Sequence, residues 1–250
     1  MHNRSKLDDQ LFHNFGIIYN FKHQRLINDY LYEFEIDTDY KRIRYDYWSE
    51  TTGTDDDIVN EIKNIRLLGG IQLSDNVKLK TGIGYRYLKD RHGFKKTTTG
   101  HNGYDRIQEY NYIPFIAEID APINSINGLL KLEYDHIFHG YNQSRLTTSA
   151  GKTFNNNEGY MVKTSYKFPY NNLNLEPYYV FQSVEESTVN QGSIEPSNTT
   201  DEYGVKISKI FGKKQKLASD YKTLIEGSSE VYFGSSLLFT RIDTGFIAAS

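Results

Sequence analysis

The 250-residue sequence has no cysteine, and this absence excludes disulfide bonds, thiolate metal sites and a cysteine nucleophile. There is no excess of positive charge either, because 29 Lys and Arg residues are set against 32 Asp and Glu residues. The sequence therefore does not predict a nucleic-acid-binding protein. It has no run of about 18 apolar residues, which excludes a transmembrane helix. A transmembrane strand is still allowed, because it needs only about 9–11 residues with apolar side chains at alternate positions.

The abundant residue types favour β-strands. Tyrosine occurs 21 times and phenylalanine 14 times, and aromatic and β-branched residues are enriched in strands. Residues 77–89 read VKLKTGIGYRYLK, in which the odd positions are apolar, aromatic or β-branched and the even positions include Lys78, Lys80 and Arg86. This period of two predicts a strand with one apolar and one charged face. Within it, Gly82 and Gly84 are expected to make room for large side chains in a curved barrel.

Ten segments alternate in this way, and no helical pattern of comparable length competes with them. The predicted strands are 12–22, 29–48, 61–73, 77–89, 105–119, 128–139, 159–168, 173–181, 201–211 and 229–242. In the second segment the alternation slips near Lys41, which predicts a β-bulge before Ile43. The predicted fold is a single all-β domain over residues 1–250, a ten-stranded antiparallel up-and-down transmembrane β-barrel.

The links between the first nine strands alternate in length. The short links are residues 23–28, 74–76, 121–127 and 169–172, and the long links are 49–60, 90–104, 140–158 and 184–200. One rim of the barrel is therefore expected to carry short turns and the other to carry long loops. Outer-membrane barrels have this arrangement, with short periplasmic turns and long external loops.

A period of two does not by itself say which face is inside, because a soluble barrel is a membrane barrel turned inside out. The strands are longer than the roughly five or six residues usual in soluble proteins, and the polar face carries charges of both signs that could pair across a closed lumen. Tyrosines near the strand ends are expected to form girdles at the two membrane interfaces; they are Tyr30, Tyr85, Tyr87, Tyr110, Tyr112, Tyr166, Tyr179 and Tyr203. These features favour the membrane barrel. The alternative is a soluble lipocalin-like barrel that binds a small apolar ligand.

The membrane interpretation assigns two sets of residues. The polar side chains expected to line the lumen are Glu33, Glu35, Asp37, Lys78, Lys80, Arg86, Lys131, Glu133, Lys163 and Glu176. The apolar side chains expected to face lipid are Val77, Leu79, Ile83, Leu130, Leu132, Val205 and Ile207. Long charged side chains from both walls are expected to fill most of the lumen, since ten strands are well below the sixteen to eighteen of water-filled porins.

Three stretches of the sequence resemble a family of porin-like outer-membrane β-barrel proteins of Gram-negative bacteria. They are GIGYRYLKDRHGFKKTTTGHNGYDRIQEYNYIPF, LNLEPYYVFQSVEES and EPSNTTDEYGVKI, and the resemblance spans residues 12–211. It implies a ten-stranded barrel in the bacterial outer membrane, and it implies no chemistry. The chain differs from this pattern at its ends, because its first link is short. The simplest interpretation is a circularly permuted strand order, with residues 212–228 as a tether and 229–242 as a strand that closes against the first.

The expected function is that of an outer-membrane barrel that acts as a structural or surface-binding protein or as a narrow porin-like channel. Its expected partners are outer-membrane lipid, lipopolysaccharide and the barrel-assembly machinery, with no nucleic acid, and a monomer is expected. No cofactor, metal site or catalytic residue is assigned.

The strand count and loop alternation are also similar to those of omptin-type outer-membrane proteases, which leaves a protease as an alternative function. The candidate groups are acids near one long loop, Asp46, Asp55, Asp56 and Asp57, and histidines near another, His136 and His139 beside Asp135. Asp135 and His136 are adjacent in a predicted strand and therefore point to opposite faces, which is a poor geometry for a catalytic pair. Phosphate contact by the loop that contains His92, Lys95, Lys96 and His101 is a further alternative to simple solvation.

Overall fold

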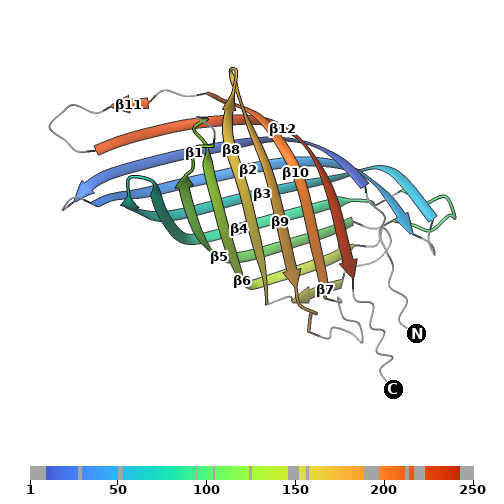
Figure 1. The fold of residues 1–250 in the computed structure, drawn as a ribbon. Coiled ribbons are helices and arrows are strands. Elements are labelled where there is room, and N and C mark those ends of the chain that lie inside the picture. The colour runs from blue at the N-terminus through green and yellow to red at the C-terminus, as the bar shows by residue number, and fades with distance from the viewer. Residues whose placement is uncertain are drawn as a thin grey trace.

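The computed structural model describes residues 10–27, 30–49, 53–93, 95–103, 105–123, 126–145, 152–155, 158–188, 197–211, 214–216 and 223–242. The described residues form antiparallel strands that curve around a common interior (Figure 1). The strands are β1 (Gln10–Ile27), β2 (Tyr30–Ser49), β3 (Gly53–Ser74), β4 (Val77–Arg91), β5 (Asp105–Asp120), β6 (Leu129–Arg145), β7 (Lys152–Asn155), β8 (Gly159–Tyr170), β9 (Leu173–Val184), β10 (Asn198–Phe211), β11 (Lys214–Lys216) and β12 (Thr223–Ile242). This part of the chain contains no helix that is long and apolar enough to cross a membrane.

Ten of the described strands close a ring in the order β1-β2-β3-β4-β5-β6-β8-β9-β10-β12, and β12 pairs back to β1. The short strands β7 and β11 lie outside the ring, where they pair with β6 and β12. Each strand of the ring pairs with its neighbours along the chain, apart from the closing pair, so the predicted up-and-down fold is confirmed. Closure leaves the ring without an unpaired edge.

The closing strand pairs on both sides. Its register runs from Gln10 opposite Leu238 to Arg25 opposite Thr223 along β1, and from Asn198 opposite Ile242 to Phe211 opposite Ser229 along β10. The strand begins at Thr223 rather than at residue 229, and β11 adds a further short pairing within 214–216. Much of the segment expected to be a tether is therefore strand. Because β1 begins and β12 ends at the same rim, the two ends of the described chain lie near each other (Figure 1).

The two rims differ, as the link lengths predict. One rim, here called the short-turn rim, carries the turns after Ile27, Ser74, Asp120 and Tyr170. At this rim, consecutive strands are joined by short links. At the opposite rim, here called the long-loop rim, β4 and β5 are joined by residues 92–104, β6 and β8 by 146–158, and β9 and β10 by 185–197.

Two details at the long-loop rim were predicted wrongly. The link 49–60 is mostly strand, since β2 continues to Ser49 and β3 begins at Gly53. The irregularity in β2 lies between Tyr45 and Tyr47, whereas the register through Lys41 is unbroken. Backbone hydrogen bonding between the strands continues beyond the segments in which one face is apolar. The alternation of apolar and polar residues can predict only those segments.

Inward-facing tyrosines lie over glycines of neighbouring strands. A side-chain Cβ atom at Gly84 would lie 2.3 Å from Tyr112 Cζ, and one at Gly16 would lie 2.0 Å from Tyr232 Cζ. The expectation that Gly84 makes room for a large side chain is confirmed. Gly82 differs, because a Cβ atom there would lie 1.9 Å from the backbone oxygen of Leu67, so that glycine allows two strands to approach closely.

This packing predicts the effect of a single methyl group. Replacing Gly84 with alanine should lower the free energy of unfolding by about 1–3 kcal/mol, because the added methyl group overlaps the Tyr112 ring. The matched control is Gly69→Ala, where the nearest atom to a new Cβ is 4.0 Å away and where the change should be within about 0.5 kcal/mol. Urea unfolding followed by circular dichroism measures both. Equal effects of the two substitutions would contradict the proposed contact.

Apolar side chains cover the outside of the ring. Many large ones are strongly exposed and lie at alternate positions of their strands: Phe15, Tyr19, Phe21, Tyr32, Phe34, Ile65, Leu67, Leu79, Ile83, Ile113, Phe115, Leu132, Tyr134, Val162, Tyr203, Val205, Ile207 and Phe233. Two of the tyrosines assigned to the outer girdles are buried instead, Tyr110 and Tyr112, with 2% and 3% of their surface exposed. A bulge between β5 and β6 at Asn111/Tyr112 lies beside them.

Candidate functional site in the lumen

The charged faces of the strands point into the barrel. Glu33, Glu35, Asp37, Lys80 and Glu133 are buried although they are ionisable, and buried charges require partners. The other five residues assigned to the lumen are also placed on the inner face, either by their ion pairs or by their position along the internal cavity: Lys78, Arg86, Lys131, Lys163 and Glu176. The residues assigned to lipid alternate with them on the outer face, and Leu79, Ile83, Leu132, Val205 and Ile207 are among the strongly exposed apolar side chains.

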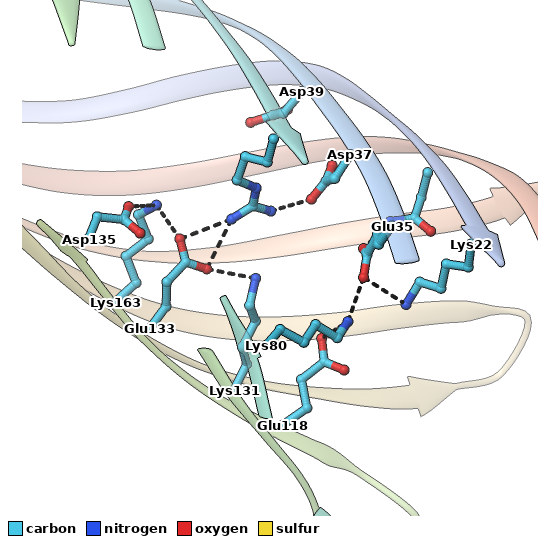
Figure 2. A network of polar contacts seen from close by, with 12 residues as sticks. Lys22, Glu35, Asp37, Asp39, Lys80, Glu118, Lys131, Glu133, Asp135 and Lys163 are labelled. Atoms are coloured by element: carbon cyan, nitrogen blue, oxygen red, sulfur yellow. Dashed lines mark hydrogen bonds and ion pairs between the residues drawn. The ribbon is translucent and has the colours of Figure 1, made fainter. Parts of the chain in front are cut away.

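Lys80 is the centre of one network in the half of the lumen nearer the short-turn rim. Its Nζ atom lies 3.0 Å from Glu33 Oε1, 2.6 Å from Glu35 Oε2 and 2.9 Å from Glu118 Oε1. Lys78 reaches Glu33 Oε2 at 2.8 Å. Lys22 of β1 lies 3.6 Å from Glu35 Oε2, so this network joins β1, β2, β4 and β5 (Figure 2).

A second network crosses the lumen from wall to wall. Arg66 of β3 contacts Asp37 of β2 and also reaches Glu133 of β6, with its Nη1 atom 3.0 Å from Glu133 Oε1. On the far wall, Lys163 Nζ lies 2.6 Å from Glu133 Oε1 and 2.7 Å from Asp135 Oδ2, and Lys131 Nζ lies 2.7 Å from Glu133 Oε2 (Figure 2). Since β4 and β5 stand between β3 and β6 in the wall, the Arg66–Glu133 contact bridges the interior rather than following the sheet.

Further bridges lie nearer the closing strand. Lys41 of β2 pairs with Glu202 of β10 at 2.8 Å, and Lys167 of β8 pairs with Glu230 of β12 at 2.6 Å. Two inner tyrosines donate hydrogen bonds to carboxylates, Tyr178 to Glu202 at 2.7 Å and Tyr232 to Asp39 at 3.1 Å. Lys206 lies 3.4 Å from Glu176 Oε1.

The sequence interpretation omitted several members of these networks, namely Lys22, Asp39, Lys41, Arg66, Glu118, Glu202, Lys206 and Glu230. Each occupies the polar phase of a predicted strand. Applying the alternation to every position would have assigned them to the inner face. Arg66, for example, lies between the outward-facing Ile65 and Leu67 and must therefore face inward.

The bridges do not fill the lumen. A cavity of about 890 Å³ runs along it, lined by charged residues of both signs, by amide and aromatic side chains and by aliphatic side chains such as Ile62 and Leu88. Its lining includes Lys22 and Glu118 in the half nearer the short-turn rim, Arg66 and Glu133 at the crossing, and His101 and Asn102 in the β4–β5 loop. Its charged and amide groups can form hydrogen bonds with water and with small polar solutes.

The β4–β5 loop packs against the end of the β2–β3 hairpin at the long-loop rim. Thr98 N donates to the Thr54 carbonyl at 2.8 Å, and Lys95 Nζ donates to the Asp56 carbonyl at 2.7 Å. His92 Nε2 lies 2.9 Å from Asp55 Oδ2, and both side chains are largely buried. This Asp/His contact was not predicted, because its two residues are on different hairpins. Lys95 adds a cation 3.9 Å from Asp55 Oδ1.

The acids and histidines considered for a protease do not converge. Asp135 is 1% exposed on the inner face, and His136 is exposed on the outer face, as their adjacency predicts. Asp57 forms an exposed ion pair with Arg44 at 3.0 Å, and the side chain of Asp46 lies outside the described residues. Among the described residues, no group of three or more His, Asp or Glu side chains is arranged to hold a metal ion.

Comparison with known proteins identifies no family. No family model and no curated protein matches the chain. Among solved structures, the translocator domain of the autotransporter NalP from Neisseria meningitidis has 9% identity and a TM-score of 0.32, covering 89% of this chain and 87% of that chain. The outer membrane protease OmpT from Escherichia coli has 8% identity and a TM-score of 0.25, covering 97% of both chains. The P. putida toluene transporter TodX has 6% identity and a TM-score of 0.27, covering 94% and 90%. These values are too low to support a functional assignment, and the resemblance to porin-like proteins stays a prediction.

Proposed function

We propose that this protein is a membrane-spanning β-barrel of a bacterial outer membrane, with a polar lumen that is narrowed by ion pairs. The observation that carries the proposal is the orientation of the strands: Glu33, Lys80 and Glu133 are buried inside, whereas Leu79 and Ile83 are 41% and 50% exposed outside. A closed ring of strands satisfies its backbone hydrogen bonds internally, which is what the hydrocarbon core of a bilayer requires. Outer-membrane lipid and lipopolysaccharide are then its surroundings, and the barrel-assembly machinery would insert it.

The same orientation argues against the soluble lipocalin-like alternative. Such a barrel encloses a mainly apolar interior, whereas here the enclosed residues, besides aliphatic side chains such as Ile62 and Leu68, include many paired charges of both signs. In water the outward apolar side chains would form an exposed surface far larger than monomeric soluble proteins usually tolerate. Lipid removes that surface from water.

The lumen favours a structural or surface-binding role, or the passage of small polar solutes, over a wide pore. The Arg66–Glu133 and Lys41–Glu202 bridges join non-adjacent strands, so a solute must pass around them. An omptin-like protease receives no support from the described residues, because the Asp55 and His92 side chains are largely buried and Lys95 lies 3.9 Å from the Asp55 carboxylate.

Folding in detergent tests the proposal. We expect the purified chain to become β-rich by circular dichroism and to migrate differently on gels before and after heating only when detergent micelles or lipid vesicles are present. This dependence follows from the outward apolar side chains. A stable, monomeric β-protein in detergent-free buffer would contradict the membrane assignment.

Conductance separates the roles that remain. Because the ion-pair bridges narrow the cavity, we expect the barrel in a planar bilayer to conduct far less current than a sixteen-stranded porin under the same salt conditions. Single-channel recording measures this directly. A porin-like conductance would show that the networks do not restrict the lumen.

A further inference from the structure

Arg86 differs from the lysines and from Arg66 in the lumen because no carboxylate among the described residues neutralises it. Most cations of the inner wall lie within 4.0 Å of a carboxylate, namely Lys22, Lys41, Arg66, Lys78, Lys80, Lys131, Lys163, Lys167 and Lys206. Within the described part of the chain, Arg86 has two contacts instead. Its Nη1 atom lies 3.3 Å from the Gln182 amide oxygen and 3.5 Å from the Met161 sulfur.

The Arg86 guanidinium also has unused hydrogen-bonding capacity. Its Nε atom is buried and has no hydrogen-bond acceptor among the described residues. A guanidinium carries five N–H donors, and a neutral amide oxygen at 3.3 Å and a thioether sulfur are weak acceptors for a positive charge. A buried donor without an acceptor is unfavourable by an amount comparable to a lost hydrogen bond. The Arg86 side chain can therefore donate further hydrogen bonds to a stronger acceptor, such as an anion.

The position of Arg86 allows a solute to reach it. It lies on the inner face of β4 and reaches β8 and β9 across the lumen, and it lines the cavity of about 890 Å³. In the strand register, Arg86 lies opposite Asn64 of β3. It is therefore one inward-facing position nearer the long-loop rim than Arg66. The amide side chains of Asn64, Gln108 and Gln182 line the same cavity and offer further donors and acceptors.

We propose that Arg86 anchors a binding site in the lumen for a small organic solute that bears an oxyanion, a carboxylate or a phosphate. Arginine forms strong, charge-assisted hydrogen bonds with both groups. A bound oxyanion would neutralise Arg86 in the way that carboxylate side chains of the inner wall neutralise the neighbouring cations. The surrounding amides then hold the uncharged part of the solute.

The neighbouring network selects among such anions. Asp135 is the cross-strand partner of Met161 and lines the same cavity, and its buried Oδ1 atom has no hydrogen-bond partner in the described part of the chain. A second negative charge on the solute would be repelled by this carboxylate, whereas a hydroxyl group on the solute could donate to it. A monocarboxylate with a hydroxyl group, such as lactate, therefore fits the site better than a phosphate dianion.

Saturation-transfer NMR on the folded barrel in deuterated detergent tests the site, with lactate as the observed probe, lactamide as its uncharged counterpart and inorganic phosphate as a competitor. We expect a lactate signal, no lactamide signal, and loss of the lactate signal only at a large excess of phosphate. Arg86→Gln should weaken lactate binding by about tenfold or more, as expected for loss of a charge-assisted hydrogen bond. Arg86→Lys keeps the charge but not the planar donors. Its affinity for lactate should lie between that of the parent protein and that of Arg86→Gln.

The matched control is Lys167→Gln, which also removes one lumen cation, but one already paired with Glu230 at 2.6 Å. It should bind lactate within about twofold of the parent protein, because Lys167 is paired with Glu230 and lies six residues beyond Met161 along β8, nearer the short-turn rim. Equal lactate binding by Arg86→Gln and the parent, equal signals for lactate and lactamide, or displacement by phosphate at equimolar concentration would each overturn the proposal. Gel mobility before and after heating shows separately that each variant is folded, so loss of binding is distinct from failure of the barrel assignment.

Discussion

Replacing Glu133 with glutamine is expected to lower the free energy of unfolding by about 3–5 kcal/mol. The carboxylate is 4% exposed and accepts contacts from Arg66, Lys131 and Lys163, at distances between 2.6 and 3.1 Å. Glutamine keeps the shape of the side chain but removes its charge, so Lys131 loses its carboxylate partner among the described residues, and Arg66 and Lys163 keep only Asp37 and Asp135. Leaving buried charges without compensation is far more unfavourable than losing a single exposed ion pair.

Urea unfolding of the protein in lipid vesicles, followed by circular dichroism, measures this effect. The matched control is Glu61→Gln, which removes the partner of Arg91 at 2.9 Å near the long-loop rim, where Arg91 is exposed. That substitution should change stability by less than about 1 kcal/mol. Similar small effects at both positions would show that water in the cavity, rather than the carboxylate of Glu133, stabilises the cations.

Leu67→Arg is expected to lower the stability of the lipid-embedded barrel by about 2–4 kcal/mol. Leu67 is 44% exposed and lies on the outer face of β3 between Ile65 and Gly69. An arginine there would place its charge in the hydrocarbon region, where it has no water and no counterion. On the surface of a soluble barrel the same substitution would be nearly neutral.

Val59→Arg is the depth control for this prediction. Val59 lies on the same face of β3 but eight residues nearer the long-loop rim, opposite Arg44 and Arg91 in the neighbouring strands. A charge near the interface should lower stability by less than about 1 kcal/mol. Unfolding midpoints of the two variants in the same vesicles give the comparison. An effect at Val59 as large as that at Leu67 would contradict the expected position of the bilayer.

The sequence predicted the barrel because a period of two survives in every strand of the ring. The segment 77–89 illustrates this, since Leu79 and Ile83 face outward and Lys80 is buried inside. The part of β3 from Gly53 to Asn60 was missed as strand because Asp55, Asp56 and Asp57 interrupt the apolar phase. Where neither face of a strand is apolar, the strands still pair through their backbones, but the sequence shows no alternation of apolar and polar residues from which to predict it.

The partners within the lumen could not be predicted in the same way. Alternation assigns Arg66 and Glu133 to the inner face, but their contact joins the non-adjacent strands β3 and β6 and residues that are 67 positions apart in sequence. That contact depends on the closure of the ring and on the register of each hairpin. The same holds for the Asp55–His92 contact and for the cavity at Arg86, which depend on how several strands are aligned.

The central claim is that the apolar face of the strands contacts lipid and the charged face does not. Single-tryptophan variants in a Trp48→Phe background test it in vesicles that contain lipids with brominated acyl chains, which quench nearby tryptophan fluorescence. Phe115 is 52% exposed on the outer face of β5, and Tyr112 is 3% exposed on its inner face. Strong quenching of Phe115→Trp with little quenching of Tyr112→Trp is the predicted result. Equal quenching at both positions, or stronger quenching at position 112, would contradict the account.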